Sequence, residues 1–144
     1  MTTLTERKDQ LLRELRAFTD KDERFRYLVE KGRELPALPE ALKLEAFLVK
    51  GCISRAWLVP QIQGQQLSFM ADSEAMIVKG IIALLLQVYN GARAEEILEI
   101  SPEFLSEAGV TEHLSMNRRN GLVNVLAMIR SYAERMRGSA PEQA

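Results

Sequence analysis

The sequence predicts an α+β fold in which a small antiparallel sheet of two to three strands packs against several helices. Two short stretches rich in apolar residues, 55–62 and 67–72, are separated by the turn Gln63-Gly64-Gln65, as expected of a hairpin. Apolar residues at helical spacing occur on both sides of it. The longest apolar run, Ile77 to Val88, is interrupted by Lys79 and is shorter than the ~20 residues of a membrane-spanning helix, so it predicts a buried helix.

Two amphipathic helices are expected before the first proline. The first has leucines at helical spacing and should end near Phe18; these are Leu4, Leu11, Leu12 and Leu15. Thr19 or Asp20 is suited to cap the second, which has Gly32 near its end. Its predicted apolar face consists of Phe25, Leu28 and Val29. Pro36 and Pro39 then mark a connection, and we expect residues 41–47 to form a loop.

The hairpin is marginal on its own, so helices should cover one of its faces. A third short strand is possible around residues 48–50. Pro60 cannot donate to a ladder, which predicts that it lies at an edge or a bulge. Trp57 is expected in the strand core, and Met70, Met76 and Met128 are expected to fill the core.

The second half of the chain is predicted to be mostly helical. Asp72 and Ser73 are expected to cap a helix that runs to about Tyr89, where Asn90-Gly91 ends it. A short helix should start at Ser101-Pro102-Glu103 and close at Gly109. The last long helix is predicted at 116–137. We therefore expect one domain over residues 1–137 and a flexible C-terminal tail at 138–144.

Composition excludes several classes of function. The formal net charge is −1 and acids and bases are mixed along the chain, so no broad basic field favours nucleic acid or a membrane surface. With a single cysteine, the chain has no intramolecular disulfide and no structural zinc site of its own, and we expect no bound metal. The polar start Met1 to Glu6 lacks an apolar signal core, which predicts a cytoplasmic protein.

Cys52 is the candidate reactive residue. A lone cysteine is often a small buried hydrophobe, but here Gly51, Ser54 and the cations Lys50 and Arg55 surround it. No acidic residue occurs from position 46 to 71, so both cations are unopposed in the local sequence. Cations lower the pKa of a nearby thiol, and the thiolate is the nucleophile. The pattern therefore predicts a reactive thiol.

Three separated stretches together resemble the SufE family of sulfur acceptors for cysteine desulfurases. They are VKGCISRAW at 49–57, DSEAMIVKG at 72–80 and LSMNRRNGL at 114–122. The resemblance extends from about Phe18 to Arg130, and the order and separation of the three blocks make it specific. It implies a fold similar to that of the iron-sulfur scaffold proteins.

The resemblance also implies a role for each site residue. Cys52 is implied to accept sulfane sulfur from the persulfide of a pyridoxal-phosphate-dependent desulfurase, SufS-like or CsdA-like, and to pass it to an iron-sulfur cluster scaffold. The protein itself is expected to need no cofactor and to act as a transfer accessory rather than as a stand-alone enzyme. Arg118 and Arg119 begin the last helix and either approach the cysteine or form a solvated or partner-binding surface.

Two other functions remain open at this stage. One is an adaptor that binds and regulates the desulfurase or the scaffold without carrying sulfur. The other is a thiol hydrolase, which ranks last because no His-Asp or His-Asn arrangement accompanies Cys52, and we assign the single histidine, His113, no catalytic role. Phe47-Leu48 and Ile53 make the flanks of Cys52 apolar, which predicts that the thiol tucks into a protected position and leaves it when a partner binds.

Overall fold

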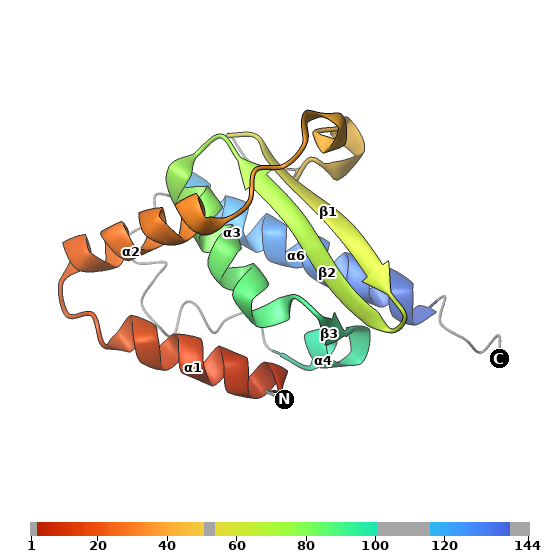
Figure 1. Cartoon of the computed structure of the whole chain (residues 1–144), viewed down its shortest axis with the longest axis horizontal. Coiled ribbons are helices and arrows are strands. Elements are labelled where there is room, and N and C mark those ends of the chain that lie inside the picture. The colour runs from red at the N-terminus through yellow and green to blue at the C-terminus, as the bar shows by residue number, and fades with distance from the viewer. Residues whose placement is uncertain (1–2, 51–53, 101–115, 139–144) are drawn as a thin grey trace.

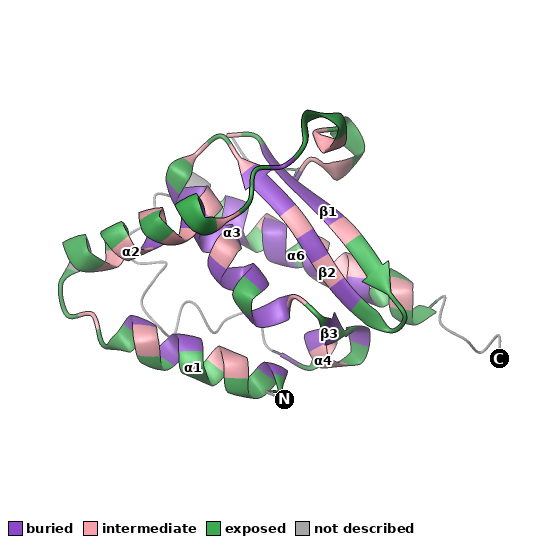
Figure 2. Ribbon diagram, viewed as in Figure 1, coloured by how far each residue is buried: buried purple, intermediate pink, exposed green. Residues whose placement is uncertain are grey.

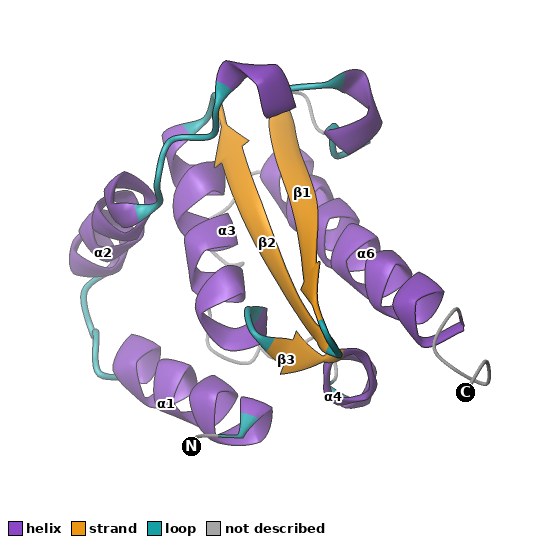
Figure 3. Cartoon of the chain, turned by 45° about the vertical axis from the view of Figure 1, so that its right-hand side comes forward, coloured by secondary structure: helices purple, strands orange, loops and turns teal. Residues whose placement is uncertain are grey.

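The computed structural model describes residues 3–50, 54–100 and 116–138 and confirms the predicted α+β class (Figure 1). A three-stranded antiparallel sheet has the strand order β1-β2-β3. Helices α3 and α6 lie on one side of the β1–β2 hairpin (Figures 1 and 3). In chain order the elements are α1 (Leu4–Arg16), α2 (Lys21–Glu34), the 3₁₀ turns η1 (Glu40–Leu42) and η2 (Glu45–Phe47), β1 (Ala56–Gln63), β2 (Gln66–Ser73), α3 (Met76–Tyr89), β3 (Ala92–Arg93), α4 (Ala94–Glu99) and α6 (Met116–Gly138).

The first two helices are capped by side chains. Thr3 Oγ1 accepts a hydrogen bond from the Glu6 N–H, and the Asp20 carboxylate accepts one from the Asp22 N–H, so Asp20 is the cap of α2. The four predicted leucines of α1 are all buried. Phe25 of α2, in contrast, is 49% exposed, and its assignment to the apolar face is wrong. Helix α2 approaches α3 at Leu28 and Gly32, and Phe25 lies outside this close contact.

Helices α2 and α3 approach each other backbone to backbone. A Cβ atom on Gly80 would lie 2.0 Å from the Leu28 carbonyl oxygen, and one on Gly32 would lie 3.0 Å from the Gly80 nitrogen. Helix α3 is the central element: it is buried along nearly its whole length, as its apolar run predicted (Figure 2).

In the part of the chain that the structure describes, no helix has the length and apolarity needed to cross a membrane.

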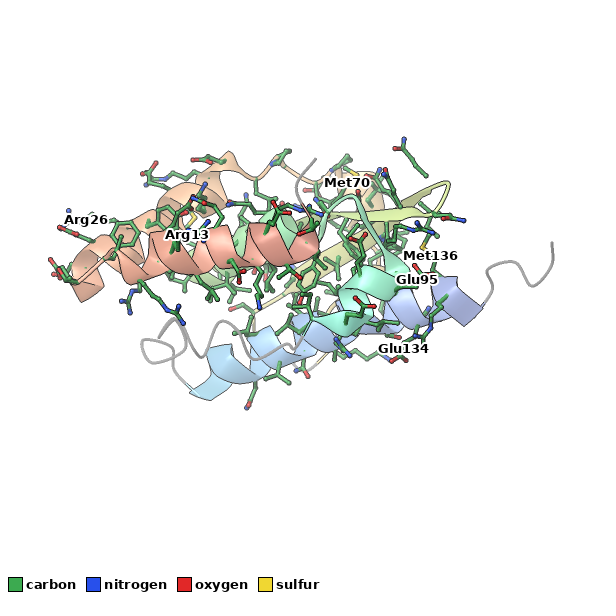
Figure 4. The ribbon with its side chains drawn as sticks, turned by 90° about the horizontal axis from the view of Figure 1, so that it is seen from below. Arg13, Arg26, Met70, Glu95, Glu134 and Met136 are labelled. Carbon is green, nitrogen blue, oxygen red and sulfur yellow. The ribbon has the colours of Figure 1, made fainter. Side chains whose placement is uncertain are left out.

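The two faces of the hairpin pack against different layers. Alternation puts Leu58, Leu67 and Phe69 on the inner face, in the main core with α1, α3, α4 and α6. Trp57 and Val59 lie on the outer face. Residues 36–48, which we call the strap, include both 3₁₀ turns and cover one end of this outer face. A second apolar cluster forms there from Leu38, Trp57 and Val59, with Leu42, Phe47, Leu48 and Met70 packed against it; Figure 4 shows Met70 on the side of the sheet away from α6.

The sheet differs from the prediction in its third strand. Around residues 48–50 the chain forms only a single bridge, between Leu48 and Trp57, whereas the third strand is β3, paired to β2 at Gln66 and Leu67. The sequence did not predict β3 because two residues carry no periodic signal. The edge position of Pro60 is confirmed, since β1 is a terminal strand of the sheet.

The predicted helix cap at Asp72 and Ser73 is wrong. Strand β2 continues through Ser73, and α3 starts at Met76 behind Ala75, which makes no side-chain cap. Ser73 Oγ instead accepts from the Ala75 N–H and donates to the Arg55 carbonyl. Met76, the first residue of α3, is 48% exposed, so the prediction that it fills the core is wrong. Met70 and Met128 are partly buried against the two apolar clusters, as expected of core filling.

The predicted end of α3 is confirmed. Gly91 has φ +81°, a conformation that favours glycine, and its N–H donates to the Leu67 carbonyl. The side-chain amide of Asn90 accepts from the Phe69 N–H at 2.9 Å and so continues the edge of β2 beyond β3. The two-residue strand β3 comes next, and helix α4, which was not predicted, follows it directly.

The last helix, α6, confirms the predicted range to within one residue. Its Arg130 donates to the carbonyls of Ile97 and Ile100 and thereby caps the C-terminal end of α4. The short helix predicted from Ser101 to Gly109, the histidine at 113 and the tail beyond Gly138 lie outside the described residues.

Candidate functional site

The candidate site is built on the segment that joins the strap to β1. Leu48 pairs with Trp57 in the isolated bridge, and the Val49 N–H donates to the Ala56 carbonyl at 2.8 Å. Residues 50–55, which we call the Cys52 segment, therefore leave and rejoin the same edge of the sheet. Cys52 and Gly51 lie outside the described residues, so the site is defined by the groups around them.

Arg55 fixes the downstream end of the Cys52 segment. Its guanidinium donates to Glu74 Oε2, at 2.8 Å from Nη2 and 3.1 Å from Nε, and its backbone N–H donates to Glu74 Oε1. The Glu74 N–H returns a hydrogen bond to the Arg55 carbonyl at 2.9 Å. These bonds from Arg55 lower the pKa of Glu74 below its ordinary value. The expectation that Arg55 is an unopposed cation is therefore wrong, because Glu74 is brought to it from 19 residues away.

The other predicted site residues are placed in part. Lys50 is exposed, and among the described residues no ion pair involves it, so it remains the candidate cation beside Cys52. Ser54 is partly buried. Arg118 and Arg119 belong to the first turn of α6, but their side chains are outside the description. Figures 1 and 3 place the beginning of α6 toward the end of the sheet where β1 begins.

The structure adds an ionic cluster that sequence reasoning missed. The carboxylate of Asp72 lies 3.4 Å from Lys79 Nζ and 3.7 Å from Lys43 Nζ. Lys43 Nζ is also 5.3 Å from the centre of the Trp57 ring, and the Arg55 guanidinium carbon is 5.6 Å from it. One signal for the cluster was in the sequence: Lys79 is the single charge in a buried apolar run, and a buried charge needs a counter-ion.

The ionisation of Asp72 follows from its contacts. Burial works to raise the pKa of its carboxyl, but the Ser73 N–H, the Lys79 ammonium and the Leu38 N–H stabilise the anion and lower the pKa below its ordinary value. The pKa of Lys43 is raised, first by its hydrogen bond to Glu40 and further by Asp72. The cluster is therefore an ion pair network at neutral pH.

The described residues on both sides of the Cys52 segment act as anchors for it. Within the described ranges, no group of three or more His, Cys, Asp and Glu side chains is placed to hold a metal ion. The Cys52 segment is fixed at both ends, by the Val49–Ala56 bond and by the Arg55–Glu74 pair. These two anchors flank the segment that carries the single cysteine of the chain.

Comparison with known proteins extends this interpretation. Residues 9–133 match the family described as SufE, Fe-S metabolism associated domain. The chain belongs to the SufE family. A SufE-like protein of Rhizobium meliloti is 36% identical over 131 residues, which cover 88% of this chain and 94% of the relative. The sulfur acceptor protein CsdE of Escherichia coli is 38% identical over 106 residues, 72% of each chain.

A solved structure shares the fold of this chain. The solution structure of a hypothetical protein from Thermus thermophilus superposes with a TM-score of 0.78 and covers 92% of this chain and 97% of the other. The sequences are 23% identical, so this similarity concerns the fold alone. The resemblance predicted from three short sequence blocks is thus confirmed at the level of the family.

Proposed function

We propose that this SufE-family chain accepts sulfane sulfur from a cysteine desulfurase on Cys52, stimulates the desulfurase by freeing its thiol, and passes the sulfur to an iron-sulfur cluster scaffold. The observation that carries the proposal is the single thiol of the chain, in the family-like block 49–57, on a segment held at both ends. The name of the Escherichia coli relative, a sulfur acceptor protein, supports the same role.

The chemistry needs few groups. The Cys52 thiolate attacks the terminal sulfur of the desulfurase persulfide, and a new S–S bond forms as the old one breaks. The electron pair of the broken bond leaves on the desulfurase thiolate, which takes up a proton, and Cys52 is left as a persulfide. No net oxidation or reduction occurs, so no cofactor on this chain takes part; the pyridoxal phosphate belongs to the desulfurase. A second exchange of the same kind delivers the sulfur to the scaffold.

The charges around the segment fit this exchange. Lys50 is exposed and is positioned by sequence to stabilise the thiolate and the persulfide anion. Arg55 contributes less to that stabilisation while Glu74 neutralises it. A free thiol that must remain reduced between cycles suits the cytoplasm, which is where we place the reaction.

Intact-mass analysis tests the proposal. The chain is incubated with a cysteine desulfurase and cysteine and compared with Cys52→Ser. We expect the native chain to gain about 32 Da, one sulfur, in a form that a thiol reductant removes, and the variant to gain nothing. Desulfurase turnover should rise with the native chain only. If Cys52→Ser stimulates turnover as well as the native chain does, the protein is a non-carrying adaptor and the proposal is wrong.

A further inference from the structure

Asp72 is unusual among the described residues because it is the one polar or charged side chain that is buried, with 8% of the residue exposed. Burying a carboxylate is unfavourable unless it is paired and hydrogen-bonded. Here it accepts from the Ser73 N–H and lies beside the ammonium groups of Lys43 and Lys79, and the backbone amide of Leu38 also stabilises its anionic form. Four groups from three separate parts of the chain thus converge on one carboxylate.

Two of those four groups belong to the strap. Leu38 and Lys43 lie on either side of η1, and the ion pair of Lys43 with the carboxylate ties the strap to β2. Among the described residues, the strap is also held by the bridge between Leu48 and Trp57 and by the small outer cluster around Trp57, which is separate from the main core. A segment with so few apolar contacts opens at a lower free energy than the core does. The ionic contacts of Asp72 therefore contribute a large part of what keeps the strap on the sheet.

The strap leads directly into the Cys52 segment. Its last residue, Leu48, bridges to Trp57, and the next residue, Val49, donates to Ala56. Trp57 also lies directly opposite Asp72 in the β1–β2 register, and Lys43 covers its ring. Lys43, which pairs with Asp72, thus also contacts Trp57, the residue that bridges to the end of the strap next to the Cys52 segment.

We propose that Asp72 is a positioning residue of the sulfur-acceptor site: through its ion pair with Lys43 it holds the strap, and the strap holds the upstream end of the segment that carries Cys52. Lys79 completes the arrangement by fixing the carboxylate to α3. The part of this inference that concerns sulfur uptake rests on the proposed function. The part that concerns the strap does not.

The chain contains a matched control for Lys43. Lys31 has the same side-chain exposure, 24%, forms an i,i+3 ion pair with a glutamate as Lys43 does, and lies 5.4 Å from the centre of the Tyr27 ring. It differs in having no ion pair to a buried carboxylate among the described residues. The variants to compare are Asp72→Asn, which keeps the size and loses the charge, Lys43→Met, Lys43→Arg and Lys31→Met.

Amide hydrogen exchange measures how readily the strap opens away from the sheet. We expect the Val49 amide, bonded to Ala56, to exchange about tenfold faster in Asp72→Asn and Lys43→Met, because a broken buried ion pair loosens the strap. Lys43→Arg and Lys31→Met should match the native chain. The Phe69 amide, bonded to Asn90 in the same sheet, should not change in any variant. Acceleration of Val49 and Phe69 together would show a loss of global stability only and overturn the proposal.

Sulfur uptake measures the consequence for the site. With the desulfurase concentration varied, we expect the maximal rate of persulfide formation to fall about fivefold in Asp72→Asn and Lys43→Met and to recover in Lys43→Arg, with half-saturation unchanged. Normal rates in the first two variants overturn the proposal. The two failures are distinct: a native chain that takes up no sulfur refutes the proposed function, whereas normal uptake with unchanged Val49 exchange refutes the role of Asp72.

Discussion

Arg55 stands three positions after Cys52 in a stretch without acids, yet its charge is neutralised by a carboxylate from the start of the next helix. Sequence distance is therefore a poor measure of which cations act on the thiol. At the residue scale, we therefore expect Glu74 to oppose the effect proposed for Lys50, because its carboxylate neutralises the guanidinium of Arg55. The reactivity of Cys52 should then depend on the Arg55–Glu74 pair.

Glu74→Gln is expected to make Cys52 more acidic. The variant keeps a hydrogen-bond acceptor for Arg55 but removes the negative charge, so the thiolate should be favoured and alkylation should shift toward lower pH. The pH profile of alkylation by iodoacetamide measures it. Glu95→Gln, at an exposed residue whose partner is Arg93, is the control. Identical profiles for the native chain and Glu74→Gln would mean that the pair does not act on the thiol.

At the scale of the elements, the crossing of α2 and α3 is fixed by glycine. The backbone of Leu28 leaves no room for a methyl group at position 80, and the backbone of α3 lies 3.0 Å from a Cβ atom at position 32. The crossing matters to the site because α3 carries Lys79 and follows Glu74, and α2 leads into the strap. A shift between these helices displaces the ionic cluster together with the core.

Gly80→Ala is expected to destabilise the fold. Its Cβ would lie 2.0 Å from the Leu28 carbonyl oxygen and 2.7 Å from the carbonyl carbon, so the helices must separate, at a cost of about 3 kcal/mol. Gly138→Ala is the control, because no atom lies within 4 Å of the added Cβ, and its effect should stay within about 0.5 kcal/mol. Urea unfolding of both variants measures the difference, and equal midpoints would refute the close crossing.

For the whole molecule, stability is expected to be flat near neutral pH and to fall at both extremes. The folded pKa of Asp72 is lowered, so its contribution is present above the unfolded value of about 3.9 and is lost as the pH falls below it. Burial raises the pKa of Tyr89 to about 12, so its contribution is present below the unfolded value of about 10 and is lost as the pH rises above it.

Thermal melts from pH 3 to pH 11 test this window. The melting temperature should decline below about pH 4 and above about pH 10, because protonation of Asp72 and ionisation of the fully buried Tyr89 both favour the unfolded chain. Asp72→Asn should flatten the acid side of the profile and leave the alkaline side unchanged. An acid limb of the same steepness in that variant would show that other carboxylates control it.

The sequence by itself determined the family, the α+β class, the hairpin and the long helices, since these depend on local periodicity and on short motifs. It also identified Cys52, because a single thiol has no competitor. Only the tertiary structure decided that Asp72 is buried in the sheet rather than capping a helix, that Glu74 neutralises Arg55, and that Lys43 joins the site. The reason is physical: local pattern sets which backbone bonds form, whereas the charge that a side chain meets depends on residues brought together from distant positions by packing.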